Sequence, residues 1–310
     1  MGDDATKTRY IQCVLCEASC GLQVQLAADG EIVDMRGHAE DPLSRGHICP
    51  KAFALKDLHE DPDRLRRPVR KIDGQWVEVS WQEAIEYVAR RIHEIQTAHG
   101  QNALGVYLGN PNVHSLGALT KGLQLVRSLK TRNVFSATSV DQLPHQVTSW
   151  GLYGHQLLLP VPDIDRTDLL VLIGHNPMAS NGSMWTVPAF PQRRRELAAR
   201  GGRLVVIDPR RTETAKVADQ HHFIRPGTDV YALLAILRTI LSRGSRAAAY
   251  VDGIEEVRAA VEPFTPEVAE SLSGMPARAI IDLADALWSA ELAAVHGRMG
   301  LSTQAFGVIG

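Results

Sequence analysis

The spacing of apolar positions near the N-terminus has a period of two at first and then becomes helical. Residues 21–26 and 31–35 each alternate apolar and polar side chains, with Asp29 and Gly30 between them. Two such segments around an Asp-Gly dipeptide are typical of a β-hairpin. Residues 50–58 then show helical spacing. We therefore expect a small β-rich unit followed by a helix.

A second helical pattern begins at Ser80 and ends near Gly100. Ser80 and Glu83 form the capping-box pattern, and glycine commonly follows the last turn of a helix. Beyond it we predict strands at 104–108, 133–135, 169–173, 204–207, 222–224 and 292–296, and helices at about 115–129, 192–200 and 229–243. The residues between the second and third of these strands are predicted to form a long polar loop. Strands that alternate with helices indicate an α/β fold with a mainly parallel sheet.

The composition is that of an ordinary soluble globular protein. Of 310 residues, 45% are hydrophobic and 5% aromatic, which is sufficient for two or three domains. The net charge of −2 gives no electrostatic reason to expect nucleic-acid binding. The longest apolar runs are far too short to span a membrane, and residues 1–7 contain neither an apolar signal core nor paired arginines. We expect a cytoplasmic protein with no membrane span.

All four cysteines lie in one segment, at Cys13, Cys16, Cys20 and Cys49. Three thiolates on one loop and a fourth from a distant loop can enclose a metal centre. This grouping favours a cubane iron–sulfur cluster, because structural zinc sites usually use two separate Cys-x-x-Cys pairs. A zinc knuckle and two disulfides are the alternatives. Disulfides fit least, since nothing indicates secretion and neighbouring loop cysteines pair poorly.

The first loop with residues suited to nucleotide binding follows the apolar strand at 169–173. Its residues are Gly174, His175, Asn176 and Pro177. Ligands in open α/β sheets bind at this end of a strand. The loop lacks the Gly-x-Gly-x-x-Gly pattern, so an ordinary NAD site is not indicated. A generic buried strand with a turn is the alternative.

Two later loops add polar groups of the same kind. Asp208 ends the following strand and can accept hydrogen bonds from a ribose diol, while Arg210 can bind a phosphate. Gly227, Thr228 and Asp229 lead directly into a helix. Asp229 can accept hydrogen bonds from a guanine ring. Alternatively, Thr228 or Asp229 only caps the helix.

The pattern C-x2-C-x3-C-x28-C-P-K, followed in order by these three loops, resembles the molybdopterin oxidoreductases. This family includes formate dehydrogenases, nitrate reductases and polysulfide reductases, and the resemblance runs from Cys13 to about Leu241. It implies a [4Fe-4S] cluster on the four cysteines and a bis-molybdopterin guanine dinucleotide cofactor with molybdenum or tungsten. It also implies that Lys51 lies between cluster and pterin and assists electron passage; the alternative is a surface lysine. The implied cofactor-binding residues are Gly174, His175, Asn176, Pro177, Asp208, Pro209, Arg210, Thr212, Gly227, Thr228 and Asp229.

The resemblance also indicates where the metal ligand lies. In this family it is a Cys, selenocysteine, Ser or Asp on a loop after an Asn-containing strand end. Counting from Asn133 places Asp141 there, with Ser139 and Ser136 as alternatives. A carboxylate suits high-valent molybdenum or tungsten, and His145 nearby is a candidate for handling protons. A ligand other than a thiolate argues against formate and periplasmic nitrate activities. The alternative is that Asp141 only caps its loop.

These observations together predict three domains and one main function. We expect a small β-rich [4Fe-4S] domain at 1–62, followed by Rossmann-like α/β layers: part of an α/β domain at 63–140 and a molybdopterin guanine dinucleotide domain at 141–310. The predicted function is an oxidoreductase that passes electrons between a small-molecule substrate and an electron-carrier protein or redox subunit. A non-catalytic iron–sulfur scaffold subunit and a zinc-stabilised nucleotide-binding protein are the alternatives. The chain ends in a Gly-rich loop, so we expect a fragment of a longer polypeptide.

Overall fold

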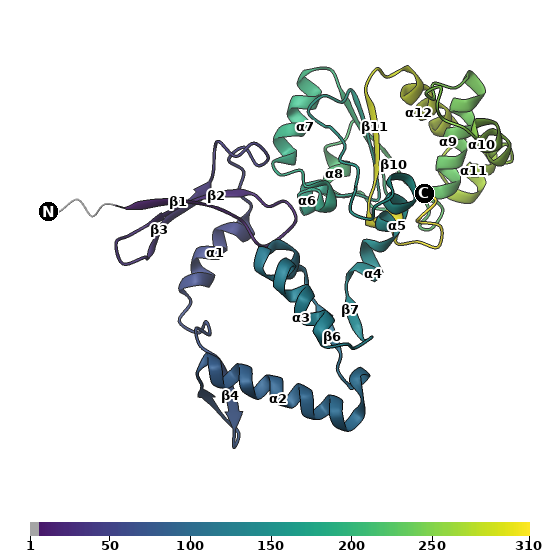
Figure 1. Cartoon of the computed structure of the whole chain (residues 1–310). Coiled ribbons are helices and arrows are strands. Elements are labelled where there is room, and N and C mark those ends of the chain that lie inside the picture. Colours follow the sequence, from purple (N-terminus) through teal and green to yellow (C-terminus); the bar gives the residue numbers. More distant parts are fainter. Residues whose placement is uncertain (1–5) are drawn as a thin grey trace. The chain divides into compact units, whose positions relative to one another are not determined.

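The computed structural model describes residues 6–310 and divides the chain into two compact units, Met1–Ala137 and Thr138–Gly310. Each unit is described separately below. Figure 1 shows the elements of both, coloured along the chain. Residues 1–5 carry part of the prediction that the chain has no export signal, and they lie outside the described residues.

The first unit begins with a three-stranded antiparallel sheet of β1 (Lys7–Gln12), β2 (Gly21–Leu26) and β3 (Ile32–Gly37), in that order. Leu22 and Val24 of β2 are buried and lie on one face, because alternate residues of a strand point the same way. Met35 of β3 pairs with Val24 and is buried beside it. Gly30 has a φ of +92° in the turn between β2 and β3, a conformation that favours glycine. The predicted hairpin is confirmed.

The helix α1 (Pro50–Glu60) follows the sheet and confirms the helix predicted at 50–58. Pro50 stands at its start, where a missing N–H costs no hydrogen bond and the fixed φ suits the helix. Ala52 is buried in the core beneath the sheet, together with Leu22 and Val24. The cysteine loops and α1 therefore share one small core.

The hairpin of β4 (Val69–Ile72) and β5 (Gln75–Glu78) leads into the long helix α2 (Trp81–His99). The Ser80 side chain accepts a hydrogen bond from the backbone N–H of Glu83 at 3.1 Å, as the capping pattern predicts. Gly100 ends the helix with a φ of +85°. The helix and both of its boundaries are thus confirmed.

The rest of the first unit contains a parallel strand pair, β6 (Val106–Leu108) and β7 (Val134–Ser136). Between them lie a short 3₁₀ segment, Asn110–His114, a π-helical turn, Ala118–Gly122, and the helix α3 (Leu123–Ser128). Another 3₁₀ segment, Gln101–Ala103, precedes β6. The helix predicted at 115–129 is present and begins with the π-helical turn.

The second unit contains a parallel sheet whose strand order is β10–β9–β8–β11. Its strands are β8 (Leu169–Ile173), β9 (Arg203–Ile207), β10 (Gln220–His222) and β11 (Ala293–Gly297). The chain proceeds from β8 to β9 and β10 on one side, and β11 then pairs with the other side of β8. The strand order therefore reverses between β8 and β11. In open α/β sheets, ligands bind at the carboxyl ends of strands at such a reversal.

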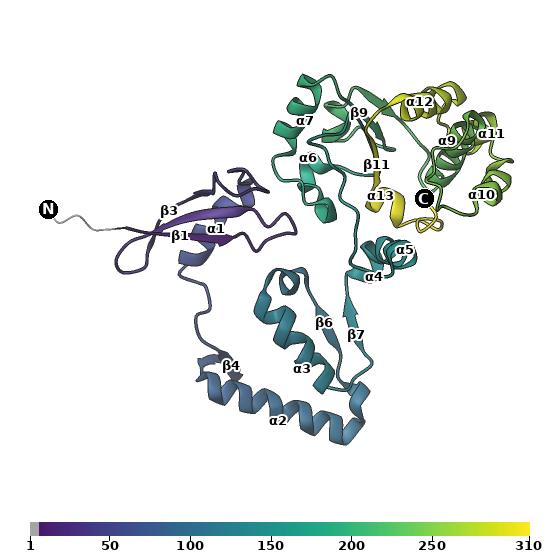
Figure 2. The ribbon, with the colours of Figure 1, turned by 45° about the horizontal axis from the view of Figure 1, so that its top comes forward.

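Helices cover both faces of this sheet, as Figure 1 and Figure 2 show. One face carries α6 (Pro177–Ser180), α7 (Phe190–Ala199) and α8 (Glu213–Lys216), and the other carries α9 (Asp229–Arg243), α11 (Pro266–Ser273) and α12 (Ala277–Ser289), with α10 (Ile254–Val261) against α9. Leu170 and Leu172 of β8 pack against Phe190 of α7. Leu169 of β8 belongs to the opposite core with Ala235 of α9. The predicted α/β class is confirmed.

The long polar loop predicted before β8 is wrong over part of its length. The structure has α4 (Thr138–Asp141) and α5 (Leu143–Tyr153) there. Pro144 in the first turn of α5 looked like a loop residue, but proline is well tolerated at this position. Trp150 and Leu152 are 66% and 70% exposed, so α5 has no continuous buried apolar face to reveal it. Gly154 ends it with a φ of +78°.

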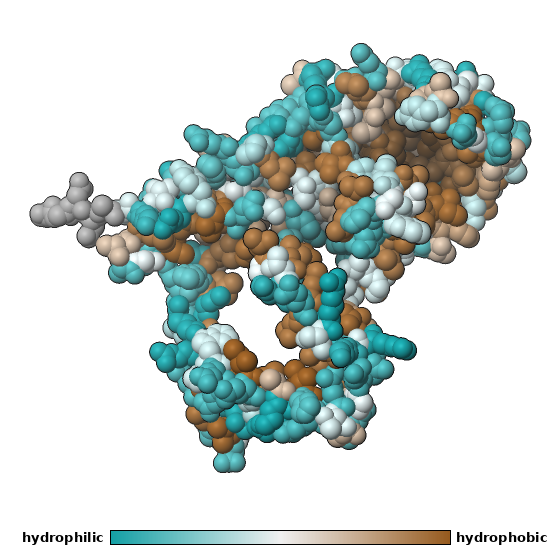
Figure 3. Space-filling model, viewed as in Figure 1, coloured by the Kyte–Doolittle hydropathy of each residue, from teal (hydrophilic) through white to brown (hydrophobic). Residues whose placement is uncertain are grey.

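The surface of the second unit includes an apolar cavity of about 300 Å³ between α9, α12 and β11. Leu237 and Ile240 of α9, Leu287 of α12 and Val295 of β11 line it. Figure 3 shows the hydrophobic colouring of a hollow over these elements. In the part of the chain that the structure describes, no helix combines the length and the hydropathy needed to cross a membrane.

Candidate functional site

The four cysteines gather in the small core of the N-terminal sheet. Cys13 and Cys20 are buried in it, Cys16 and Cys49 pack against it, and all four are free thiols. The backbone N–H of Cys13 donates to the carbonyl of Cys20 at 2.8 Å and closes the first loop. Cys49 is the N-cap residue of α1. Four unpaired thiols in one core fit an iron–sulfur cluster, and the disulfide alternative has no support.

Burial favours the protonated form of the two buried thiols, Cys13 and Cys20. It raises the pKa of the Cys13 thiol, and it raises the pKa of the Cys20 thiol to about 12. The neighbouring cysteines act in the same direction, whereas the charge of Lys51 lowers the pKa of Cys13. A metal ligand must be a thiolate, so loading of iron at these residues releases protons. Within residues 6–310, no group of three or more His, Cys, Asp or Glu side chains is arranged to hold a single metal ion.

The carboxyl ends of β8 and β11 approach each other through glycines. Gly174 follows β8 with a φ of +55°, and Gly300 lies in α13 (Met299–Ser302), just after β11. The backbone N–H of Gly300 donates to the carbonyl of Gly174 at 3.0 Å. A Cβ atom at Gly174 would lie 2.6 Å from the backbone of Gly300. Only glycine fits here, and this contact lies where the strand order reverses.

The other residues of the first predicted loop mainly stabilise the loop by hydrogen bonds to neighbouring segments. His175 is buried, and its Nε2 lies 3.1 Å from the carbonyl of Gly182. The Asn176 side chain accepts hydrogen bonds from Thr214 and donates to Glu213 at 2.7 Å. Pro177 starts α6. These contacts connect the ends of β8 and β9, and a cofactor role for the loop stays a prediction.

The second and third predicted loops meet at the ends of β9 and α9. The Asp208 side chain accepts a hydrogen bond from the backbone N–H of Arg210 at 2.8 Å. Asp229 is buried, accepts a hydrogen bond from Gln304, and has one carboxylate oxygen with no partner among the described residues. Burial raises the pKa of Asp229, and the charge of Asp208 adds to this shift. The two carboxylates predicted to hold a nucleotide therefore lie near each other.

The remaining predicted residues of these two loops lie in caps, turns and exposed positions. They are Thr212, Thr228, Gly227, Pro209 and Arg210. Thr212 caps α8 by accepting a hydrogen bond from the N–H of Ala215 at 3.1 Å, and Thr228 donates to the carbonyl of Arg225 at 2.5 Å. Gly227 has a φ of +84° in the turn before α9. Pro209 and Arg210 are exposed at the end of β9. The binding of a phosphate by the exposed Arg210 stays a prediction.

The candidate metal ligand Asp141 ends α4 in the second unit. Its Oδ1 atom is buried and has no hydrogen-bond partner among residues 6–310. Of the alternatives, Ser139 is exposed in α4 and Ser136 lies in β7 of the first unit. His145 begins α5, one turn after Asp141, and its Nε2 lies 3.0 Å from the carbonyl of Gly297. An unpartnered buried carboxylate oxygen fits a metal ligand.

Two protein-family models match this chain. The model described as molybdopterin oxidoreductase matches residues 64–298, and the model described as molybdopterin oxidoreductase Fe4S4 domain matches residues 6–58. The chain belongs to the molybdopterin oxidoreductase family. The recognised resemblance is confirmed, and with it the pair of cofactors, a [4Fe-4S] cluster and a molybdenum or tungsten pterin. The domain boundaries at 62 and 140 and the roles of single residues stay predictions.

Curated relatives of this molybdopterin oxidoreductase include formate dehydrogenases. F420-dependent formate dehydrogenase 2 subunit alpha of Methanococcus maripaludis is 27% identical over 97% of this chain and 44% of its own length. Formate dehydrogenase H of Escherichia coli is 29% identical over 94% of this chain and 41% of its own length. The chain therefore spans less than half the length of these relatives. The name of the first relative shows that some members of the family act as subunits of larger assemblies.

A solved structure supports the fold assignment. Acetylene hydratase from Pelobacter acetylenicus superposes with a TM-score of 0.78 and 21% sequence identity, over 97% of this chain and 41% of that chain. This similarity shows that the family fold is shared.

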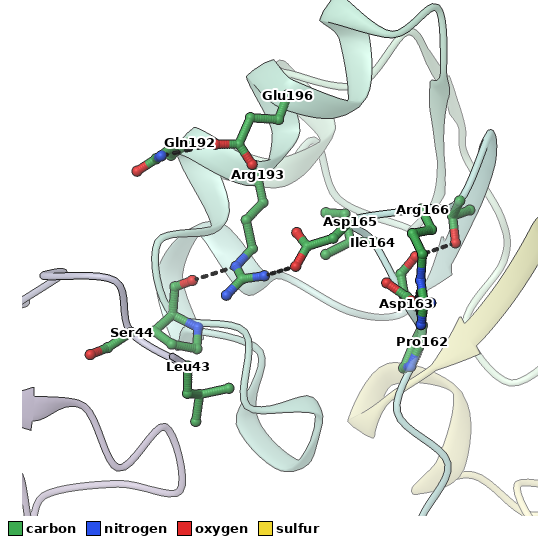
Figure 4. Close-up of polar contacts among 12 residues, drawn as sticks. Leu43, Ser44, Pro162, Asp163, Ile164, Asp165, Arg166, Gln192, Arg193 and Glu196 are labelled. Carbon is green, nitrogen blue, oxygen red and sulfur yellow. Dashed lines mark hydrogen bonds and ion pairs between the residues drawn. The ribbon is translucent and has the colours of Figure 1, made fainter. Parts of the chain in front are cut away.

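A strained segment of this molybdopterin oxidoreductase follows the loop after β8. Asn181, Ser183, Thr186 and Ala189 all have left-handed φ values between 49° and 58°. Non-glycine residues in this conformation store strain and tend to occur at functional sites. Arg193 of α7 is buried and holds the end of the segment, since its Nε donates to the carbonyl of Pro188 at 3.1 Å and its Nη1 pairs with Asp165 (Figure 4).

Our reading of the sequence missed three residues of this region. Gln304 bonds Asp229, Gly300 contacts Gly174, and Arg298 is buried with its Nη2 donating to Ser183 at 2.8 Å. All three lie in the Gly-rich segment after β11. This segment is rich in glycine and follows a predicted strand. That pattern could have indicated a further loop at the carboxyl ends of the strands.

We expect Gly174→Ala to lower the free energy of unfolding by about 1–3 kcal/mol or more, because a left-handed alanine must also displace the backbone of Gly300. Chemical denaturation of the cofactor-free chain measures it. Gly151→Ala is the matched control, since Gly151 lies in α5 with open space around it. That control should be neutral or stabilising by up to about 1 kcal/mol. Equal stabilities for the two variants would contradict the close contact.

Asp229 makes stability depend on pH in a predictable direction. Its pKa is raised in the folded state, so the folded state binds more protons than the unfolded state between the two pKa values, and stability falls as pH rises through this range. We therefore expect Asp229→Asn to gain stability relative to wild type as pH rises from about 4 to 7. Thermal unfolding of the cofactor-free protein at both pH values tests this, with Asp252→Asn on an exposed loop as the control. A difference that stays constant with pH would contradict it.

Proposed function

We propose that this chain is the cluster-bearing and nucleotide-binding part of a molybdenum or tungsten oxidoreductase. In this proposal it exchanges electrons between a small-molecule substrate and a redox partner. The observation that carries the proposal is the gathering of four free cysteines in one buried core, with Cys49 at the N-terminus of α1. Membership of the family supplies the second cofactor.

In this proposal, the cysteines and the polar loop residues bind different cofactors. Cys13, Cys16, Cys20 and Cys49 bind the [4Fe-4S] cluster, and Lys51 contributes positive charge close to Cys13. Asp208 and Asp229 accept hydrogen bonds from the nucleotide end of the pterin cofactor, which Arg210 helps to neutralise. When bound, the pterin–metal group supplies two-electron chemistry. The protein positions this group and conducts single electrons to the cluster.

Asp141 is the proposed protein ligand of the metal. Its buried Oδ1 has no partner among the described residues, and a carboxylate is a hard donor suited to high-valent metals. A carboxylate in place of a thiolate argues against formate as the substrate of this chain, although relatives are named formate dehydrogenases. We further propose a separate electron-carrier subunit as partner and a cytoplasmic location.

Anaerobic metal analysis of protein purified without added metal tests the proposed function. We expect about four irons per chain, as one cubane requires, together with molybdenum or tungsten. Iron without either heavy metal would instead support a non-catalytic electron-transfer or scaffold subunit. Zinc alone, at about one per chain, would support the zinc-stabilised protein and overturn the proposal.

A further inference from the structure

Three histidines from separate parts of the second unit form one cluster near the β8/β11 edge. His175 follows β8, His296 lies in β11 and His145 begins α5. The ring centroids of His175 and His296 are 5.1 Å apart, and those of His145 and His296 are 6.5 Å apart. Trp185 packs against His175 and His296 at 5.6 and 5.5 Å. His296 was not a predicted site residue, and the proposed function gives it no role.

The hydrogen bonds define which nitrogen atoms of these rings carry protons. Nε2 of His145 faces the carbonyl of Gly297, and Nε2 of His175 faces the carbonyl of Gly182. A carbonyl only accepts, so each Nε2 carries the proton and each Nδ1 keeps a lone pair. Both Nδ1 atoms are buried without a hydrogen-bond partner in the described chain, as is Nε2 of His296.

These imidazoles are uncharged at neutral pH. Burial lowers the pKa of His175 to about 4 and that of His296 to about 3, and burial also lowers the pKa of His145. The positive charge of Arg298 acts on all three in the same direction. The bare Nδ1 atoms of neutral His145 and His175 are hydrogen-bond acceptors, so a group that binds either of them must be a donor. Water is the donor that buried polar groups of this kind ordinarily bind.

A cavity next to the cluster has room for such water. It measures about 370 Å³ and lies between α5, β11 and α13, elements that Figure 2 labels. His145, His296 and Ser302 line it, and the Ser302 hydroxyl is buried without a partner among residues 6–310. Tyr153, at the other end of α5, also lines it and is 51% exposed. The volume is enough for several water molecules, each of which occupies about 30 Å³ in the liquid.

Helical spacing connects this cavity to the proposed metal ligand. Asp141 ends α4, and Gln142 has helical dihedral angles before α5 begins. His145 is four residues after Asp141, so the backbone of the proposed ligand lies about one helical turn from His145 along the chain. His145 also lines the cavity with His296 and Ser302.

We propose that His145, His296 and Ser302 hold a chain of water molecules in this cavity and move protons between the metal site and solvent. The proposal rests on the proposed function, because Asp141 defines the metal site. A proton released near Asp141 adds to Nδ1 of neutral His145, while the Nε2 proton stays on Nε2, hydrogen-bonded to the carbonyl of Gly297. The same proton then passes from Nδ1 to a water held by His296 and Ser302, and leaves past Tyr153. Each proton step breaks one N–H or O–H bond and forms another, so the bonds balance. The electrons leave separately through the cluster.

Nuclear magnetic resonance of the 310-residue chain with ¹⁵N-labelled histidine tests the water chain without any bound cofactor. We expect His145 and His175 to be Nε2–H tautomers at pH 7. His296→Phe should shift the Nδ1 resonance of His145, because phenylalanine cannot hold the linking water. His296→Gln, which keeps an acceptor, should leave that resonance near its wild-type position.

His222→Gln is the control, since His222 lies in β10 at the far edge of the sheet. An Nδ1–H tautomer at His145, or a His145 resonance unmoved by His296→Phe, would overturn the proposal.

Turnover of the metal-loaded protein tests proton transfer itself. His296→Phe should retain iron and molybdenum or tungsten, lower kcat by at least about 10-fold with KM little changed, and alter the solvent deuterium isotope effect. His296→Gln should lose less, and His222→Gln should match wild type. A metal-loaded His296→Phe variant with unchanged kcat would overturn the relay and leave the proposed function standing. Absence of molybdenum and tungsten from the wild-type protein would instead overturn the proposed function.

Discussion

Replacement of Cys20 by alanine is expected to remove the iron–sulfur cluster from the purified protein. Cys20 is only 5% exposed and belongs to the core that also contains Cys13 and Leu22. Because Cys20 is buried, its replacement by alanine leaves three thiolates and no side-chain donor at the fourth ligand position. We expect iron to fall from about four atoms per chain to below about one, with loss of the broad visible absorption.

The structural consequence of this change should also be large. The cluster joins the cysteine loop after β1 to the start of α1, and metal binding to such loops is coupled to their folding. We expect the N-terminal domain of Cys20→Ala to be cleaved more readily by protease than that of the wild type. Iron analysis, the visible spectrum and limited proteolysis under anaerobic conditions measure both effects.

Two controls separate ligand loss from general damage. Lys56→Ala changes α1 about two turns after Cys49, where Lys56 pairs with Glu60 at 3.8 Å, and should keep full iron content. Cys20→Ser keeps the size and a weaker oxygen donor, so its iron content should lie between those of wild type and Cys20→Ala. Full iron content in Cys20→Ala would show that Cys20 is not a cluster ligand.

Local patterns predicted the elements that depend on local chemistry. The helix predicted at 229–243 has the bounds of α9, Asp229–Arg243, because a Gly-Thr-Asp turn precedes it, Gly244 follows it and its apolar residues recur at helical spacing. The four cysteines could be associated in advance for another reason, since the chain has no other cysteine and all four lie in one segment, residues 13–49. By contrast, α5 was missed because its apolar residues Trp150 and Leu152 are exposed and do not mark a buried face.

Contacts between distant segments could not be predicted in this way. Gly174 meets Gly300, and His145 lies near His296, only because β11 pairs with β8 in parallel after seven intervening α-helices, α6 to α12. The partner of a strand is decided by packing of the whole sheet, and periodicity within one segment carries no information about it. Sequence could indicate that polar loops end the strands, but not which loops touch.

Replacement of Asp141 is the second change from which we expect a large effect. Asp141→Ala removes the only carboxylate at the predicted ligand position and should reduce bound molybdenum or tungsten or, where the metal stays, lower kcat by more than about 100-fold. That loss exceeds the 10–100-fold typical of residues that only support a ligand. The iron content should stay at the wild-type level, because the four cysteines belong to the other unit.

The chemistry of the replacement decides whether Asp141 binds the metal or only caps its loop. Serine and cysteine both supply an anionic donor to a metal, whereas asparagine keeps the shape and hydrogen bonding of a capping aspartate. As a ligand, Asp141 should be replaced better by serine or cysteine than by asparagine; as a cap, asparagine should be the best replacement.

Asp163→Asn, on an exposed loop of the same unit, is the control and should behave as wild type. Heavy-metal analysis and the electron paramagnetic resonance signal of the metal in all five variants measure the outcome. Full metal content and activity in Asp141→Asn would show that another residue binds the metal, and Ser139 would be the next to test.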